Sequence, residues 1–580
     1  MIYIIAIGIY LLVLTAIGVV KSRQVKSQED FALAGRSLSP WTMVLTMLAV
    51  WIGTGSILGN AEQAYETGMA TLIIPLGTFL GMILLALIAS RARDIEATSV
   101  PEIIGNRFGM VARFLAVIAL IMAYMVIVSY QFNAGGGVIE VITGDHAPVP
   151  IRVGDRVTDR QMTRGRLAFT PSDGFIGQVS LSFEHPATAE SLGYTVHVVP
   201  EAALAGTLDK IKDQMNTIAI KSGDTARLTT FALPSGKGQY GVLSLPDQGR
   251  LEVIEPKISK ETATAIAAIF IIVFTMLAGL KSLASMDIVT GSIITISLLI
   301  TFPVLLNKAG GFAGMRDAYA LMPDRGQHMQ FWGVYSPVTI INYLLPTFLL
   351  VVGDANQYQR IFASRNAKGA KQAVVTLVFA ALAIELLIIA CAWIAGSLTP
   401  EETNGRYILI YAARHHLPYA LGILFMITVV GVIISTADSF LLVPATTFIN
   451  DIYCKHINPK ADEKRVIFVS RVLVMVFGVI AFLVTHAFAE TTGFFDKALY
   501  AYTIYGAAVT PSLVAALFWK GATKAGAIAS IATGTVVTVV WSEWEKLPSS
   551  VAELDAVLPA IILSVLMLVG VSLLTQTPQK

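Results

Sequence analysis

The sequence predicts an all-α polytopic membrane protein with about 13 transmembrane helices and one β-rich domain inserted outside the membrane. Of the 580 residues, 55% are hydrophobic and only 14% are charged, whereas soluble domains carry roughly 25% charged residues. Apolar runs of about 20 residues, the length that crosses a bilayer core, recur along the chain. A single long polar stretch interrupts them.

The apolar runs give the positions of the expected helices. These are residues 2–20, 39–66, 70–92, 111–140, 261–280, 286–306, 336–359, 371–396, 418–448, 465–487, 493–519, 524–543 and 555–575. The first run has no small-residue cleavage site after it, so we expect a retained helix. The net charge of +2 is too small to indicate a nucleic-acid partner.

Basic residues between the runs predict the orientation, because cytoplasmic loops carry an excess of Lys and Arg. An external N-terminus makes four basic loops cytoplasmic: Lys21, Arg23, Lys26 and Arg36; Arg91, Arg93 and Arg107; Arg360, Arg365, Lys368 and Lys371; and Lys455, Lys460, Lys464 and Arg465. We therefore expect a multi-pass protein of the plasma (inner) membrane, with the C-terminus inside.

The chain divides into three expected parts: helices one to four in 1–143, an inserted domain in 144–258, and the remaining helices in 259–580. The insert contains short alternating runs that predict strands, namely IRV, RLAFTP, GQVSLSFEH, GYTVHVVP and RLEVI, around a helix-like EAALAGTLDKIKDQMNTI. Its FTP and GF turn followed by an alternating strand resembles bacterial cadherin-like or immunoglobulin-like modules. The orientation places it outside, where a passive cap or a surface for a protein partner is a more ordinary interpretation than solute binding.

The second predicted helix is interrupted by glycines. From Ala49 it reads AVWIGTGSILGNAEQAYETG, with Gly53, Gly55 and Gly59 at mid-membrane depth. Freed carbonyls at that depth are tolerated where they line a cavity or an ion site. A small-residue face for close helix packing is the alternative.

The seventh predicted helix provides a second interruption, NYLLPTFLLVVGDANQYQR, with Pro346, Gly353 and an intramembrane Asp354. It lies five helices after the first interruption. Two broken helices in corresponding positions of two five-helix halves are typical of an inverted-repeat transporter with a midplane site. We therefore expect a 5+5 inverted-repeat core of the leucine-transporter type.

The ninth predicted helix carries GVIISTADSFLLV, in which Ser435 and Thr436 are adjacent hydroxyls and Asp438 is an acid inside the membrane. Such hydroxyls often bond back to their own helix. A carboxylate at this depth costs about 2.5–3.5 kcal/mol on insertion scales and marks a pathway or ion site. Sodium selects oxygen ligands, which hydroxyls and freed carbonyls would supply.

Together, these segments resemble the sodium/solute symporter family, which includes sodium-driven sugar, proline, sialic acid, pantothenate and choline carriers. The resemblance covers about 1–143 and 259–575. The motifs that carry it are DFALAGRSLS at 30–39, WIGTGSILGNAEQAY at 51–65, GLKSLASMD at 279–287, QYQRIFASRN at 357–366, STADS at 435–439, NDIY at 450–453 and TPSLVAALFWKGATKAGA at 510–527.

The resemblance implies sodium as the coupling ion. It implies that one sodium is held by Ala49, Ile52, Val432, Ser435 and Thr436. Some members hold a second sodium with an acid that corresponds to Asp287 and with hydroxyls one turn along the ninth helix. Here Asp438 replaces one of those hydroxyls and Ser439 keeps the other, so Asp438 either strengthens a second cation site or shares a proton with Asp287.

By position, the resemblance also implies a solute site at the two breaks and on the third, eighth and eleventh helices. The expected solute contacts are Trp51, Gly53, Thr54, Ser56, Thr78, Thr347, Asp354, Glu385, Tyr502 and Tyr505. Glu385 is as easily a hydrogen-bonded packing residue as a cavity residue. An aromatic face can hold a quaternary ammonium, so Trp51 with the two acids suits a cationic or amine-bearing solute.

The function predicted is sodium-coupled symport of a small organic solute by alternating access. One alternative is a proton-coupled carrier that uses Asp438, Asp287 or Glu385. Another is a non-transporting sensor that keeps the symporter fold and contacts a partner through the insert. We do not expect an enzyme, because the sequence has no nucleophile–base set, phosphate loop or metal-ligand cluster with supportive spacing.

Overall fold

A computed structural model gives the fold of residues 2–23, 25–95, 97–163, 166–186, 188–211, 214, 216–228, 238–322, 325–399, 405–488, 492–544 and 553–576. Across these ranges, 12 helical spans are long and apolar enough to cross a membrane, and a bent pair brings the number to 13. The polytopic all-α fold with a small β insert is therefore confirmed. Every predicted apolar run corresponds to one of these spans.

The single-piece spanning helices are α1 (Ile2–Ser22), α5 (Pro75–Asp94), α7 (Met110–Thr143), α10 (Lys260–Leu277), α11 (Leu280–Lys308), α15 (Ala367–Ser397), α18 (Glu463–Val484), α19 (Phe494–Phe518), α20 (Lys524–Ser542) and α21 (Val557–Thr575). A further span runs from α17 (Tyr419–Phe448) into the π-helix η6 (Ile449–Ile457). Shorter helices are α2 (Gln28–Leu33), α6 (Val100–Phe108), α12 (Gly311–Ala320) and α16 (Ile408–His415).

The first glycine-rich run forms a bent span. Helix α3 (Pro40–Trp51) begins at Ser39, whose hydroxyl accepts the Thr42 amide hydrogen at 3.2 Å. After the break, the chain continues through η2 (Gly55–Gly59), α4 (Asn60–Thr67) and η3 (Gly68–Ile73), bent by 55° from α3. At Gly53, a Cβ atom would lie only 2.9 Å from the Thr436 side chain. Glycine therefore allows α17 to approach the break closely.

The second predicted break lies between α13 (Pro337–Gly353) and α14 (Ala355–Phe362). Asp354 separates them with non-helical backbone angles, and its carboxylate accepts the Asn356 amide hydrogen at 3.1 Å. Asp354 therefore caps α14, which is the ordinary structural role of an Asp at a helix N-terminus.

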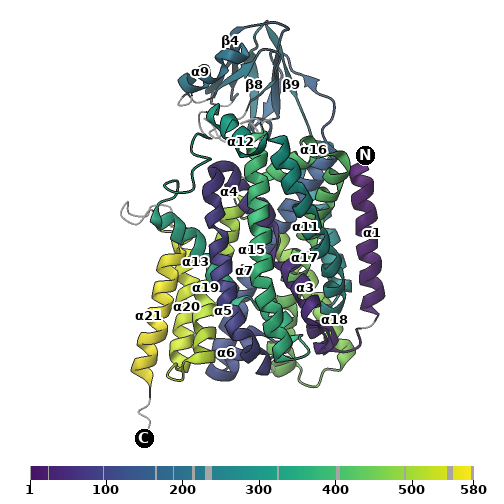
Figure 1. The fold of residues 1–580 in the computed structure, drawn as a ribbon, viewed down its shortest axis with the longest axis vertical. Coiled ribbons are helices and arrows are strands. Elements are labelled where there is room, and N and C mark those ends of the chain that lie inside the picture. Colours follow the sequence, from purple (N-terminus) through teal and green to yellow (C-terminus); the bar gives the residue numbers. More distant parts are fainter. Residues whose placement is uncertain are drawn as a thin grey trace.

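The insert consists of two sheets around its own apolar core (Figure 1). One sheet has the order β1 (Val149–Pro150), β9 (Gly249–Val253), β3 (Leu167–Pro171), β7 (Ala226–Leu228). The other has the order β2 (Arg156–Thr158), β8 (Gln239–Ser244), β4 (Gly177–Glu184), β5 (Ser191–Val199), β6 (Thr217–Lys221). Two short helices, α8 (Asp159–Thr163) and α9 (Glu201–Ile211), also belong to it.

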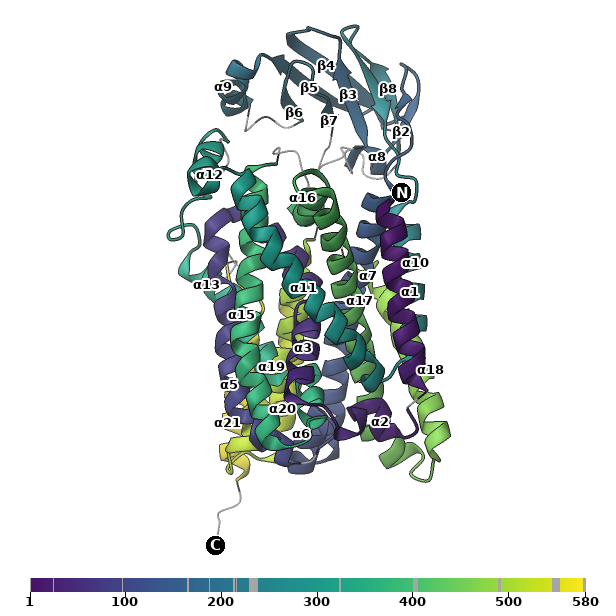
Figure 2. The same ribbon diagram turned by 45° about the vertical axis from the view of Figure 1, so that its right-hand side comes forward.

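Most of the predicted strand runs form strands, but IRV at 151–153 lies between β1 and β2. Strands β5 and β6 run parallel, joined through α9. A parallel pair sets this domain apart from the antiparallel sheets of immunoglobulin folds. The insert covers the end of the bundle at which the chain begins, and the C-terminus lies at the opposite end (Figure 2).

Candidate functional site

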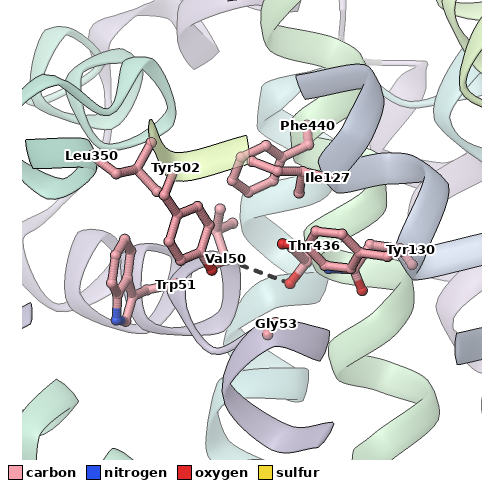
Figure 3. A pocket seen from close by; sticks show the side chains of 11 residues that line it. Val50, Trp51, Gly53, Ile127, Tyr130, Leu350, Thr436, Phe440 and Tyr502 are labelled. Atoms are coloured by element: carbon pink, nitrogen blue, oxygen red, sulfur yellow. Dashed lines mark hydrogen bonds between the residues drawn. The ribbon is translucent and has the colours of Figure 1, made fainter. Parts of the chain in front are cut away.

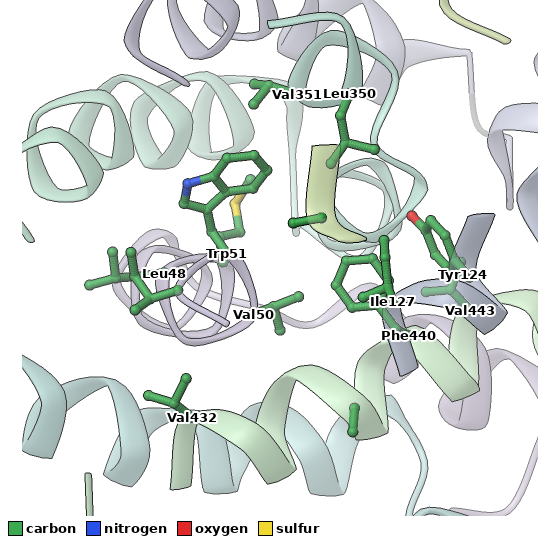
Figure 4. Packing of buried hydrophobic residues seen from close by; sticks show 14 of the residues in the cluster. Leu48, Val50, Trp51, Tyr124, Ile127, Leu350, Val351, Val432, Phe440 and Val443 are labelled. Carbon is green, nitrogen blue, oxygen red and sulfur yellow. The ribbon is translucent and has the colours of Figure 1, made fainter. Parts of the chain in front are cut away.

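The first break meets two hydroxyls of α17. The Ser435 hydroxyl lies 3.5 Å from the Ala49 carbonyl oxygen, and the Thr436 hydroxyl donates to the Val50 carbonyl oxygen at 3.4 Å (Figure 3). Ile52 ends α3 and Val432 lies one turn before Thr436 on α17; both are fully buried. Figure 4 shows Val432 facing α3 near Val50. All five expected sodium ligands thus belong to one junction.

A buried ion pair adjoins this junction. Asp287, on α11, accepts the Ser435 hydroxyl hydrogen at 2.6 Å and the Thr46 hydroxyl hydrogen. The Arg360 guanidinium lies 3.5 Å from the same carboxylate, and both side chains are at most 1% exposed. The sequence-based assignment of Arg360 to a cytoplasmic loop is therefore wrong, because α14 carries this residue back into the bundle.

The other two residues of the expected second cation site, Asp438 and Ser439, contact different helices. Ser439 accepts a hydrogen bond from Arg360 Nη2 at 2.8 Å. Asp438 turns to α10, where Thr275 donates to one carboxylate oxygen. Its second oxygen is buried with no hydrogen-bond partner among the described residues. Asp287 and Asp438 are close enough to interact electrostatically, but each accepts hydrogen bonds from different groups.

Two adjoining cavities lie beside the break and share Trp51, Gly55 and Tyr502 on their walls. The first is lined by Val50, Trp51, Gly53, Gly55, Ile127, Tyr130, Gln131, Leu350, Thr436, Phe440 and Tyr502. The second is lined by Trp51, Gly55, Ser56, Asn60, Ile74, Thr78, Thr347, Glu385, Phe495, Ala498, Leu499 and Tyr502. Thr436 of the hydroxyl pair is thus part of the wall of the first cavity.

Seven of the ten expected solute contacts line these cavities: Trp51, Gly53, Ser56, Thr78, Thr347, Glu385 and Tyr502. Glu385 is hydrogen-bonded to two of the others. Its Oε1 accepts hydrogen bonds from Trp51 Nε1 at 2.8 Å and from Thr78 at 3.2 Å. Its Oε2 is buried and, within the described part of the chain, has no hydrogen-bond partner. One carboxylate oxygen thus fixes the indole, and the other is left for a donor.

Three expected solute contacts do not line either cavity. Thr54 donates to the Gln131 side-chain carbonyl. Asp354 accepts the Tyr124 hydroxyl hydrogen at 2.6 Å and caps α14. The Tyr505 ring packs against Tyr124, with ring centroids 5.8 Å apart. These side chains are on the expected helices but face neighbouring helices.

The family follows from comparison with known proteins. A family model described as the sodium:solute symporter family matches residues 31–149 and 254–534. The chain belongs to this family. The match stops at 149 and resumes at 254, so strands β2 to β9 lie outside it. The sodium:solute symporter family is one of transporters, not enzymes.

Individual relatives of this symporter-family chain are distant. The sodium/proline symporter of Staphylococcus aureus is 25% identical over 324 residues, or 54% of this chain and 62% of the relative. The osmoregulated proline transporter OpuE of Bacillus subtilis (strain 168) is 24% identical over 318 residues, or 53% and 62%. The alignments thus span less than two thirds of these relatives. A Na+-coupled sialic acid symporter in a substrate-bound outward-open state shares the fold, with a TM-score of 0.66, 14% identity, and coverage of 100% of this chain and 99% of that chain.

Several residues of the symporter cavities were missed from the sequence. Tyr130 and Gln131 of α7, Asn60 of α4 and Phe440 of α17 line them. Gln131 gives a usable signal, since a polar amide inside the 34-residue apolar helix α7 is unusual. Tyr130 and Phe440 give none, because aromatic residues are equally common in ordinary helix packing.

Proposed function

We propose that this protein is a sodium-coupled symporter of a small organic solute. The observation that carries the proposal is the approach of the Ser435 and Thr436 hydroxyls to the carbonyls of Ala49 and Val50, where α3 breaks. Freed carbonyls and hydroxyls are the oxygen ligands that a hard cation needs. The names of the relatives, two proline carriers and a sialic acid symporter, support the same class.

In the proposed mechanism, sodium from outside is held by Ala49, Ile52, Val432, Ser435 and Thr436. A negative-inside potential favours sodium entry across the whole membrane by about 2.3 kcal/mol per charge per 100 mV. Because the ion would bridge α3 to α17, its binding free energy differs between the outward-open and inward-open arrangements. Thr436 also lines the first cavity. Sodium binding therefore completes a wall of the solute site, which couples the two ligands.

The proposed orientation places the N-terminus and the insert outside and the C-terminus inside, in the plasma membrane. The positive-inside rule supports it. The insert lies at the N-terminal end of the bundle and the C-terminus at the other. A reporter fused after Lys580 should be active only in the cytoplasm, and activity only outside would reverse the assignment.

The hydroxyl pair provides the test of sodium coupling. Ser435→Ala combined with Thr436→Ala should abolish sodium-dependent uptake in proteoliposomes, because it removes both hydroxyl ligands. The matched control is Ser530→Ala with Ser564→Ala, a buried hydroxyl pair between α20 and α21. It removes two buried hydroxyls from helices other than α3 and α17. Unchanged sodium dependence in the first variant, with both proteins folded, would refute the assignment of these ligands.

Within this class we propose an amine-bearing or cationic solute. The free oxygen of Glu385 would accept an N–H donor, and the Trp51 indole, held by the other oxygen, provides an aromatic face for a cation. Asp354, which the sequence suggested as a third contributor, caps α14 with one carboxylate oxygen and lines neither cavity. Competition of amines, amino acids, sugars and carboxylates for uptake tests the class, and Glu385→Gln should weaken amine competition selectively. Competition by sugars or carboxylates but never by amines would exclude it.

A further inference from the structure

A guanidinium already occupies the place where a second coupling cation would bind. Arg360 lies between Asp287 of α11 and Ser439 of α17, the acid and the hydroxyl that could hold such an ion. We propose that Arg360 is the resident cation of this position, so that the transporter carries one sodium ion in each cycle. This inference rests on the proposed sodium-coupled symport.

The contacts of Arg360 account for all three guanidinium nitrogens. Nε donates to the Thr46 hydroxyl at 3.1 Å, Nη1 to the Asn356 carbonyl oxygen at 3.3 Å, and Nη2 to Ser439 at 2.8 Å. The side chain is 0% exposed. Arg360 thus joins four elements, α3, α11, α14 and α17, and contacts both the Asp287 carboxylate and the Ser439 hydroxyl that a second cation would use.

The charge balance at this position is already complete. Asp287 and Arg360 form a pair that is at most 1% exposed, with no net charge. A sodium ion at the same place would add an uncompensated positive charge beside a buried guanidinium. Charge burial without a partner is strongly unfavourable, and like charges repel strongly where water is absent.

Asp438 does not supply the further negative charge that a sodium ion at this position would need. Its carboxylate bonds to Thr275 of α10, whereas Ser439, the next residue, contacts Arg360. The two residues leave the helix in different directions. At the second cation position, Asp438 is therefore directed elsewhere, and Ser439 is already bonded to Arg360.

Asp287 instead supports the first sodium site. A hydroxyl has one proton, and the 2.6 Å contact with Asp287 takes that of Ser435. The Ser435 oxygen then keeps its lone pairs for a cation at the Ala49 carbonyl, as a carboxylate behind a ligand orients it. Arg360 holds Asp287 in place for this role.

The number of bound ions tests the inference without knowledge of the solute. Radioactive sodium should bind to the purified full-length protein with one ion per chain and a Hill coefficient of one. Two ions per chain would overturn the inference and leave sodium-coupled symport intact. Binding of no sodium would overturn the proposed function itself, and the inference with it.

Arg360→Gln sharpens the test because it removes the guanidinium and keeps hydrogen-bonding capacity. The variant should bind a second sodium, with the count rising from one to two and the Hill coefficient above one. Adding Asp287→Asn removes the carboxylate and should return the count to one or less. The matched control, Arg365→Gln, changes an exposed arginine whose Nε bonds to the Ser37 carbonyl oxygen, and should stay at one.

A folded Arg360→Gln protein that still binds one ion would contradict the assignment of Arg360 as the resident cation. If this variant does not fold, the count for the unmodified protein still decides whether the second position accepts sodium.

Discussion

The helical body and the inserted domain treat charge in opposite ways. Within the described residues, no charged side chain of the insert is buried, and its core consists of aliphatic and aromatic side chains. The body buries several acids and an arginine completely, among them Asp287, Arg360, Glu385 and Asp438. Burial of charge is costly in both places. Among the described residues, the interior of the insert is therefore apolar, whereas the body retains ionic groups around the break and its cavities.

The largest expected effect breaks the ion pair of the body. Asp287→Ala leaves the Arg360 guanidinium buried without its counter-ion, which costs about 3–5 kcal/mol. The variant should show a large drop in the thermal unfolding temperature of the detergent-solubilised protein. Glu29→Ala, which removes the acid from an exposed pair with Arg36, should leave that temperature nearly unchanged. Equal effects of the two changes would show that the buried pair contributes no more to stability than the exposed pair.

A comparable loss is expected in the insert, from packing alone. Phe169 on β3 is fully buried in the insert core. Phe169→Ala should destabilise that domain by about 3–5 kcal/mol, because it leaves a cavity. Limited proteolysis should then cleave between β1 and β9 while the helical body stays intact. Ile176→Ala is the control, since this side chain is 57% exposed. Simultaneous unfolding of the body would show that the two regions are not independent.

The smallest effect is expected at the end of the body opposite the insert. Burial opposes ionisation of Glu102, but hydrogen bonds from Lys455 and from the Thr98 hydroxyl and backbone outweigh it and lower the pKa of Glu102. A carboxyl whose pKa is lowered by folding stabilises the fold at pH values above its unfolded pKa of about 4.3. This stabilisation is lost as the pH falls through the folded pKa. Since Lys455 is partly exposed, Glu102→Gln should cost about 0.5 kcal/mol at pH 7.

The pH dependence of that small effect can be measured directly. Unfolding temperatures of the unmodified protein and of Glu102→Gln should differ at pH 7 and converge as the pH falls below the pKa of Glu102. A difference that grows with acidity would mean that the carboxylate is destabilising in the fold. This measurement extends the comparison from the fully buried Asp287–Arg360 pair to the partly exposed Glu102–Lys455 pair.

Much of the fold could be predicted because lipid imposes strong constraints on sequence. Runs of apolar residues predicted the 13 spans found among the described residues, and Gly53 with its neighbours indicated the break that bends one of them by 55°. The insert was evident from the collapse of hydropathy, but its parallel β5–β6 pair was not. Parallel pairing depends on where α9 returns the chain, which alternation within a strand does not encode.

The site was predicted less completely, because a sequence indicates the helix but not the direction of each side chain. Glu385 contacts Trp51 and Thr78, which the sequence places with it at the expected solute site. Asp354 was assigned to the solute site from the break itself, and the same break makes it a helix cap. Arg360 was assigned to a loop because basic residues follow it, whereas helix α14 continues inside the bundle.

The first and last strands of the insert, β1 and β9, are hydrogen-bonded to each other, with Val149 opposite Val253. The chain therefore leaves the insert beside the point at which it arrives. Helices α7 and α10, which flank it, also pack against each other. The whole domain thus connects two neighbouring helices of the body, as a short loop would. A lineage could gain, lose or exchange such a module in one recombination event without changing the spacing of any helix.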